Sequence, residues 1–466
     1  MQKSATLKRS LGLWPIVMLG VGYMTPMVVF DTFGIASKEA DGHVPMAYII
    51  ALVAMLFTAF SYGKMVRAFP SAGSAYTYTQ KTISPHLGFL VGWSSLLDYL
   101  LLPMVNALLT QIYLSALFPE VPAWIWVVGF VALVTIINAV GVNSTANFNT
   151  LFVLYQMLVV VIFVILAVRQ LIGGFGYGEV FPVGPLYTPD MHMSTLIAGA
   201  TVLCFSFLGF DAVTTYSEET PNPTKTIPRA IFFTALIGGL VFIVGSYFTQ
   251  ALFPDITRFK NPDATSPEIA LYAGGKVFQM FFLAGALAGT IASGLASHAS
   301  VSRLLYVMGR DNILPQKLFG YVHPRTHTPL FNVILVGFIS MTAVFFTLEI
   351  ASAFISFGAL IAFTFVNLSV IAHYALKKKE YKTLGGFLSH ILLPIIGAAF
   401  VAVLWYNLEA SSFTMGVIWF GIGLVYLMYV TKLFRVRPMD IHFEEADEES
   451  AVIEGEPIVE NGVLAK

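Results

Sequence analysis

The sequence predicts an all-α integral membrane protein with twelve transmembrane helices. Hydrophobic residues make up 57% of the 466 residues, charged residues make up only 11%, and the mean hydropathy is +0.78. A soluble domain carries about 25% charged residues, so a chain this apolar is unable to cover its surface in water. Long apolar runs also recur from the N-terminal region to the C-terminal region, as a chain that crosses a membrane many times requires.

Runs of roughly 18 or more apolar residues are long enough to span a bilayer as a helix. The predicted spans are residues 11–36, 44–66, 87–118, 121–139, 148–172, 194–216, 227–253, 277–302, 329–348, 351–375, 384–408 and 413–433.

Lysine and arginine are distributed unevenly among the predicted loops. If the N-terminus is cytoplasmic, all but five of the 25 lysines and arginines fall in cytoplasmic segments. Cytoplasmic loops of membrane proteins carry an excess of these residues, so both termini are predicted to be cytoplasmic. Residues 1–10 are then a cytoplasmic N-terminus, and residues 434–466 form an acidic cytoplasmic tail that we expect to be disordered. The five outer residues are Lys38, Arg169, Arg258, Lys260 and Lys276.

Two predicted spans contain residues that interrupt a helix. Pro26 lies inside the first span, and Gly209 lies inside the sixth. Interrupted helices at corresponding positions of two halves indicate a transporter binding site near the middle of the membrane. We therefore expect two five-helix halves, residues 11–172 and 194–375, followed by two further helices within residues 384–433.

Three acidic residues lie inside the predicted spans, namely Asp31, Asp98 and Asp211. An ionisable residue inside the membrane is costly and is therefore a candidate functional residue. We expect no lysine or arginine beside them in the helix interiors. Carboxylates without basic partners suit a cationic ligand, because the ligand supplies the missing charge. Asp211 and Asp31 are also the candidates for proton coupling.

Five further residues complete the candidate substrate site. Tyr23 and Thr25 lie beside the first interruption, and Phe207 and Gly209 lie at the second. Tyr99 follows Asp98 directly in the third span. Aromatic faces bind cations by cation–π contacts worth about 2 kcal/mol when desolvated. Packing against neighbouring helices is the alternative role for the aromatic residues.

The sequence has no sign of catalytic chemistry. It has one cysteine, no phosphate-binding loop, no metal-spaced Cys/His cluster and no nucleophile motif. We therefore expect the protein not to be an enzyme, to use no cofactor or metal, and to bind no nucleic acid.

Several segments resemble a known transporter family. The chain is similar to the amino acid–polyamine–organocation superfamily in residues 59–78, 205–213, 217–223, 227–231 and 302–315. The resemblance spans nearly the whole chain in the family's order. It implies a five-plus-five inverted repeat with two additional helices, and a secondary active transporter that works by alternating access.

Within that superfamily, the chain most resembles bacterial putrescine importers of the proton-symport type, in residues 26–35, 41–45 and 92–100. This implies a multi-pass protein of the bacterial inner membrane, surrounded by lipid, that takes up putrescine or a similar diamine with protons as the coupling ion. Amino acid carriers of the superfamily have a glycine-rich interruption in the first helix that holds the substrate carboxylate. Tyr23, Thr25 and Pro26 stand there instead, which favours a substrate without a carboxylate.

Other functions remain open at the sequence level. The chain could be a permease for cationic or neutral amino acids, a diamine exchanger, or an amine sensor that moves nothing. Sodium is the alternative coupling ion, because the eighth span carries hydroxyl side chains where sodium-coupled relatives form a cation site. Helix packing is the role we favour for these hydroxyls, on Thr290, Ser293, Ser297 and Ser300.

Overall fold

The computed structural model describes residues 7–255, 259, 265–346, 348–408 and 410–433, and these residues contain helices but no strand. The tail 434–466, residues 1–6 of the N-terminus, Arg258 and Lys260 lie outside the described residues. The α-helices are α1 Leu13–Met24, α2 Val28–Asp31, α3 Phe33–Glu39, α4 Val44–Ala68, α5 Ser74–Thr82, α6 Pro85–Leu117, α7 Ala123–Val140, α8 Val142–Ile172, α9 Met193–Leu203, α10 Pro223–Leu252, α11 Ser266–Arg310, α12 Gln316–Phe319, α13 Leu330–Met341, α14 Leu348–Val370, α15 Leu384–Phe387, α16 Leu393–Tyr406 and α17 Ala410–Val430.

The described residues form eleven helical stretches that are long and apolar enough to cross a membrane, together with a shorter apolar stretch, Leu330–Phe345. The twelve predicted spans are therefore confirmed as twelve apolar helical stretches. Some are longer than predicted, most of all α11, which includes the predicted span 277–302 but continues to Arg310.

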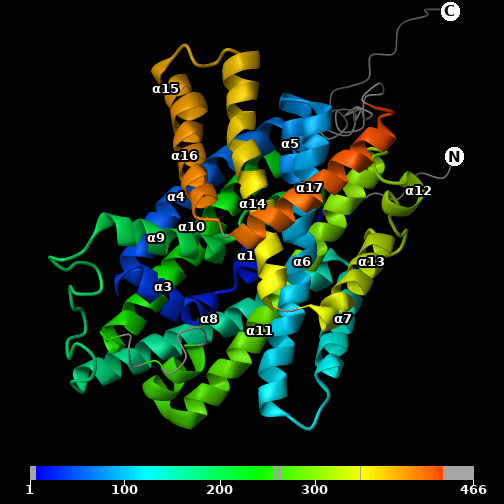
Figure 1. Ribbon diagram of the computed structural model, residues 1–466. Coiled ribbons are helices and arrows are strands. Elements are labelled where there is room, and N and C mark those ends of the chain that lie inside the picture. Colours follow the sequence, from blue (N-terminus) through cyan, green and yellow to red (C-terminus); the bar gives the residue numbers. More distant parts are fainter. Residues whose placement is uncertain (1–6, 256–258, 260–264, 347, 409, 434–466) are drawn as a thin grey trace, which may run out of the picture.

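The interrupted α1 lies in the centre of the bundle, where it packs against α8, α10 and α11. The long helix α6 packs against α11 and α14, while α16 and α17 lie outside α14. Figure 1 shows α15 at one end of the bundle and the turn between α6 and α7 at the other. These ends are called the α15 end and the α6–α7 end below.

The predicted interruption of the first span is confirmed. Helix α1 ends at Met24, Thr25 has a φ of 56°, and the chain resumes as the single turn α2. Pro26 has no backbone N–H, so the regular hydrogen-bond pattern stops here. The Ser293 hydroxyl of α11 donates to the carbonyl oxygen of Tyr23 at 3.1 Å. A neighbouring helix thus satisfies a backbone group that the interruption sets free, as a membrane interior demands.

The predicted interruption of the sixth span is also confirmed. Helix α9 gives way to a 3₁₀ turn, Cys204–Phe207, and a second 3₁₀ segment follows at Ala212–Glu219. Between them Gly209 has a φ of +112°. A Cβ atom at Gly209 would lie 2.1 Å from Cδ1 of the Tyr23 ring. The position therefore requires glycine both for its backbone conformation and for the close approach of Tyr23.

We predict that Gly209→Ala lowers the yield of folded protein and its melting temperature. The new methyl group would collide with Tyr23, and the left-handed conformation would add a cost of roughly 1–2 kcal/mol. Gly129→Ala is the matched control, because nothing lies within 4 Å of a Cβ atom there. Equal melting temperatures for the two variants, measured by fluorescence thermal unfolding in detergent, would contradict this account of Gly209.

Candidate functional site

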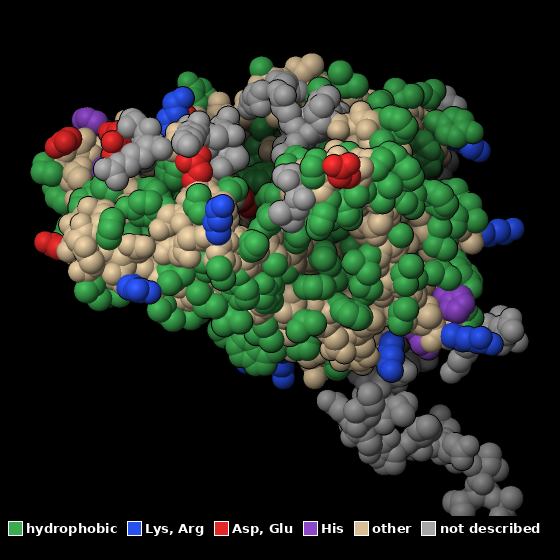
Figure 2. Space-filling model, turned by 90° about the horizontal axis from the view of Figure 1, so that it is seen from below, with side chains coloured by type: hydrophobic (Ala, Val, Ile, Leu, Met, Phe, Trp, Pro, Cys, Tyr) green, Lys and Arg blue, Asp and Glu red, His purple; other side chains and the backbone are tan. Residues whose placement is uncertain are grey.

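A cavity lies between α1, α2, α6, α11 and the interruption after α9, with an empty volume of ≈ 610 Å³ that includes its open mouth. Figure 2 views the molecule from the α6–α7 end and shows a hollow in that face. The lining residues are Tyr23, Met24, Thr25, Met27, Val28, Asp31, Leu102, Val105, Asn106, Leu109, Tyr113, Phe205, Ser206, Leu208, Ala286, Thr290 and Ser293.

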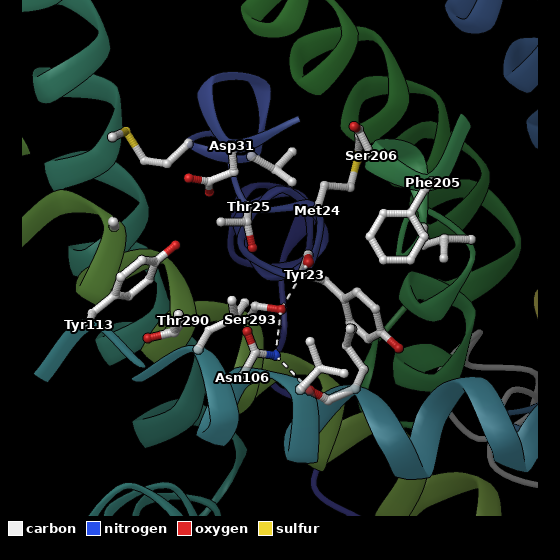
Figure 3. Close-up of a pocket in the computed structure, with 17 residues that line it drawn as sticks. Tyr23, Met24, Thr25, Asp31, Asn106, Tyr113, Phe205, Ser206, Thr290 and Ser293 are labelled. Atoms are coloured by element: carbon white, nitrogen blue, oxygen red, sulfur yellow. Dashed lines mark hydrogen bonds between the residues drawn. The ribbon is translucent and has the colours of Figure 1, made fainter. Parts of the chain in front are cut away.

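Among the described residues, Asp31 is the acidic residue of this lining, and the lining includes no lysine, arginine or histidine. The Ser266 hydroxyl donates to Oδ1 of Asp31 at 2.6 Å. Figure 3 shows the Tyr113 side chain facing the Asp31 carboxylate. The Ser266 hydroxyl thus holds the carboxylate at the cavity wall. Asp31, which the sequence places inside the first predicted span, is the last residue of the short helix α2.

Hydroxyl and amide side chains line the wall on the α6 and α11 side. The Asn106 amide donates to the Ser293 hydroxyl at 3.0 Å, and the Thr110 and Thr290 hydroxyls are 2.8 Å apart. These bonds join α6 to α11 and to the interrupted α1. The hydroxyls of α11 therefore serve helix packing, as the sequence favoured, while Thr290 and Ser293 also face the cavity (Figure 3).

A second group of polar side chains is buried near Tyr23 and is called the inner acid cluster; it comprises Asp98, Asp211, Tyr62, Tyr99 and the Tyr23 hydroxyl. The Tyr99 hydroxyl donates to Oδ2 of Asp211 at 2.7 Å, and the Tyr62 hydroxyl donates to the same atom at 3.4 Å. Asp98 and Tyr23 both interact electrostatically with Asp211. Among the described residues, Oδ1 of Asp98, Oδ1 of Asp211 and the Tyr23 hydroxyl have no hydrogen-bond partner.

Three unpartnered oxygen atoms in one buried site indicate a place for a proton or a positively charged group. Buried polar groups are nearly always hydrogen-bonded, because an unsatisfied group costs about 1–3 kcal/mol. Two neighbouring carboxylates without a cation repel one another, so a proton or an ammonium group relieves both costs. The inner acid cluster is therefore suited chemically to hold and release a cation.

The candidate residues thus divide into those that line the cavity and those that do not. Tyr23, Thr25 and Asp31 line the cavity. Phe207 is buried against Phe242, with ring centroids 5.5 Å apart, which favours packing over cation binding for this residue. Asp211, a candidate for substrate binding and proton coupling, is outside the lining and interacts electrostatically with Tyr23. The candidates outside the lining are Asp98, Tyr99, Phe207, Gly209 and Asp211.

The sequence did not predict a role for Tyr62 or Ser266. Tyr62 binds Asp211, which is 149 residues away in the chain, and Ser266 binds Asp31, which is 235 residues away.

Beyond the inner acid cluster, two ion pairs connect the second 3₁₀ segment to α11. Arg303 binds Glu219 through two nitrogen atoms, with Nη2 2.9 Å from Oε1, and both side chains are buried. Arg310 binds Glu218 at 2.8 Å and 3.0 Å and is partly exposed. Arg303 lies inside α11, past the predicted end of that span, but its partner is Glu219 and not one of the three candidate acids. Among the described residues, the cavity lining contains no basic side chain.

The loop that follows α11 makes a further contact near these two ion pairs. The Tyr76 hydroxyl of α5 donates to Oδ2 of Asp311 at 2.6 Å. Burial raises the pKa of Asp311 to about 6, although the bond from Tyr76 and the nearby Arg310 oppose the rise. Together with the two ion pairs, this contact joins α5 and the second 3₁₀ segment to the C-terminal end of α11. Within the described ranges, no group of three or more His, Cys, Asp or Glu residues is arranged to hold a metal ion.

Comparison with known proteins gives consistent results. A family model described as amino acid permease matches residues 15–436. The low-affinity putrescine importer PlaP of Escherichia coli strain K12 is 53% identical over 429 residues, which cover 92% of this chain and 95% of that protein. The methylthioribose transporter of Bacillus subtilis is 28% identical and covers 92% of this chain and 95% of that protein. Cationic amino acid transporter 4 of Mus musculus is 28% identical over 78% of this chain and 60% of that protein.

We predict that Arg303→Gln strongly destabilises the protein, because it leaves Glu219 as a buried charge without a partner. Removing one member of a buried ion pair costs about 3–5 kcal/mol. The double variant Arg303→Gln/Glu219→Gln should recover part of the loss, and the more exposed Arg310→Gln should cost only about 0–1 kcal/mol. Thermal unfolding in detergent measures all three variants. Equal losses for Arg303→Gln and Arg310→Gln would contradict the central role of the buried pair.

Proposed function

The chain belongs to the amino acid permease family, and we propose that it is a secondary active transporter that imports putrescine or a closely related small polyamine. The observation that carries the proposal is the cavity, whose lining, in the part of the chain that the structure describes, contains the carboxylate of Asp31 and no basic side chain. A ligand with an ammonium group supplies the missing charge, whereas a free amino acid would bring a carboxylate that has no partner. The PlaP protein of Escherichia coli, 53% identical, supports the same substrate.

The direction of transport follows from the proposed topology. With both termini cytoplasmic, the α15 end faces the cytoplasm and the α6–α7 end faces the outside, in the inner membrane of a bacterium. The cavity mouth then faces outward, and the ion pairs of Glu218 and Glu219 close the cytoplasmic side. In this state the protein is ready to accept an external amine, with Asp31 as its first contact.

We assign proton coupling to the inner acid cluster, with Asp211 as the principal residue and Asp31 as its partner in the cavity. Tyr23 lines the cavity and interacts electrostatically with Asp211, so a movement of its ring would expose Asp211 to the cavity. With a proton on one carboxylate of the inner acid cluster and an ammonium group on another, both cations would be bound at the same time. Release of the proton and the amine together on the cytoplasmic side would be symport.

We predict that Asp31→Asn weakens the apparent affinity for putrescine by roughly 10- to 100-fold, because hydrogen bonds to charged groups contribute about 1.5–3 kcal/mol. Some transport should remain at saturating putrescine. Asp41→Asn is the matched control, since Asp41 is an exposed acid whose φ of 48° asparagine also tolerates. Uptake of labelled putrescine into proteoliposomes gives the apparent affinities.

Competition in the same assay tests the charge requirement. Agmatine and other diamines should compete with putrescine, and alanine and serine should compete poorly. Inhibition by alanine at concentrations that match putrescine would assign the protein to neutral amino acids instead. Exchange without net accumulation would identify a diamine exchanger, and binding without uptake would identify a sensor.

We predict that Asp211→Asn abolishes concentrative uptake while the purified variant remains folded. The substitution keeps size and hydrogen bonding to Tyr99 but removes the group that exchanges a proton. A protonophore should lower wild-type uptake to the level of the variant, and putrescine should still raise the melting temperature of Asp211→Asn. Wild-type accumulation by this variant would refute the assignment, and a strict sodium requirement that a protonophore leaves untouched would refute proton coupling.

A further inference from the structure

A cluster of basic and aromatic side chains lies near the α15 end of the bundle, far from the cavity. It is called the basic platform below and comprises Lys64 of α4, Tyr374 and Lys378 at the end of α14, and His390 before α16. The His390 ring stacks on Tyr374 with centroids 4.6 Å apart and planes 7° apart. Nζ of Lys64 lies 3.2 Å from Nε2 of His390 and 5.7 Å from the Tyr374 centroid. Nζ of Lys378 lies 5.3 Å from the same centroid.

Unusual backbone geometry holds the basic platform in place. Two π-helical segments, Ile371–Lys377 and Leu388–Leu392, pack against one another and carry Tyr374 and His390. Such segments are rare and are frequent at functional sites. The Tyr374 hydroxyl donates to the carbonyl oxygen of Lys64 at 3.1 Å, which fixes α4 against the first segment. The structure thus brings three separate spans together at this one point.

The hydrogen bonds of His390 define how Lys64 is presented. The Lys64 ammonium is donor only, so Nε2 of His390 accepts, and Nδ1 carries the hydrogen and donates to the carbonyl oxygen of Glu380. Lys64 therefore has two further N–H groups to donate. Within the described part of the chain, it has no carboxylate within ion-pair distance. A half-buried cation without an anion is a site for an external one.

The surroundings are basic on one side and apolar on the other. Residues 377–382 contain four lysines and one glutamate, and that glutamate lies 3.9 Å from Lys378. Exposed apolar side chains continue from this stretch onto α15 and α16, which form a membrane span at the edge of the bundle (Figure 1). They are Leu376, Leu384, Phe387, Leu388 and Leu392.

We propose that the basic platform binds the phosphate headgroup of an anionic phospholipid, whose acyl chains lie along the apolar side chains of α15 and α16. Basic pockets between membrane helices suit such headgroups, and each lysine near an anionic surface contributes about 1 kcal/mol, or roughly a fivefold change in affinity. A soluble phosphate shares the headgroup chemistry but has no use for the apolar flank. The bound lipid would connect α4, α14 and α16.

The test compares lipids with one acyl composition and different headgroups, added to the purified full-length protein in neutral detergent. Phosphatidylglycerol and cardiolipin should raise the melting temperature of the wild type, and native mass spectrometry should show them bound. Phosphatidylcholine and inorganic phosphate should have little effect. Lys64→Gln and Lys378→Gln should each weaken lipid binding about fivefold. Lys317→Gln, an exposed lysine of α12, is the matched control and should bind as the wild type does.

Two outcomes would overturn the proposal. Equal effects of anionic lipid on Lys64→Gln, Lys378→Gln and Lys317→Gln would show that general surface charge, and not the basic platform, attracts the lipid. Equal stabilisation by inorganic phosphate would assign the site to a soluble anion. If Lys64→Gln does not fold, the exposed Lys378→Gln carries the test alone. Putrescine-induced stabilisation of each variant shows that the fold is intact, independently of lipid.

Discussion

The contact between Tyr23 and Gly209 is the constraint on which the rest of the structure depends. It is where the two interrupted spans meet, and the absence of a side chain at Gly209 allows the ring to lie directly on the backbone. Tyr23 lines the cavity together with Asp31, and it also interacts electrostatically with Asp98 and Asp211, which are buried outside the lining. One aromatic side chain is therefore shared by the cavity and the buried pair of acids. Alternating access requires a division between two compartments that open at different times.

The interruptions also explain the placement of polar residues on the surrounding helices. A helix that stops inside a membrane leaves backbone groups that water is unable to reach, and a neighbouring helix must supply partners. Ser293 does this for the Tyr23 carbonyl, and Asn106 and Thr290 extend the network to α6. These residues shape the cavity wall at the same time. The side chains that stabilise the interrupted backbone are thus also the ones that a ligand would meet.

Local sequence signals predicted the number of spans, the two interruptions and the acidic residues within the membrane, because apolar runs, Pro26 and Gly209 act on the chain around them. Contacts between distant segments carried no such signal. The sequence predicted that Arg303 lies in a loop, because its charge follows the end of an apolar run. In the structure its buried partner Glu219 neutralises that charge, and α11 continues past it. The position of Asp211 near Tyr23 depends in the same way on packing between spans far apart in the sequence.

Because each of the two ion pairs has no net charge, the membrane voltage has little effect on their movement. Moving one elementary charge across a potential of 100 mV changes its energy by about 2.3 kcal/mol. The net charge of each ion pair, Arg303 with Glu219 and Arg310 with Glu218, is zero. If the second 3₁₀ segment and α11 move through similar depths of the membrane when they separate, little net charge is displaced. The electrical work of the cycle then falls on the cargo and on the acids that meet it. A negative interior would draw a cationic amine inward without biasing the two ion pairs themselves toward either conformation.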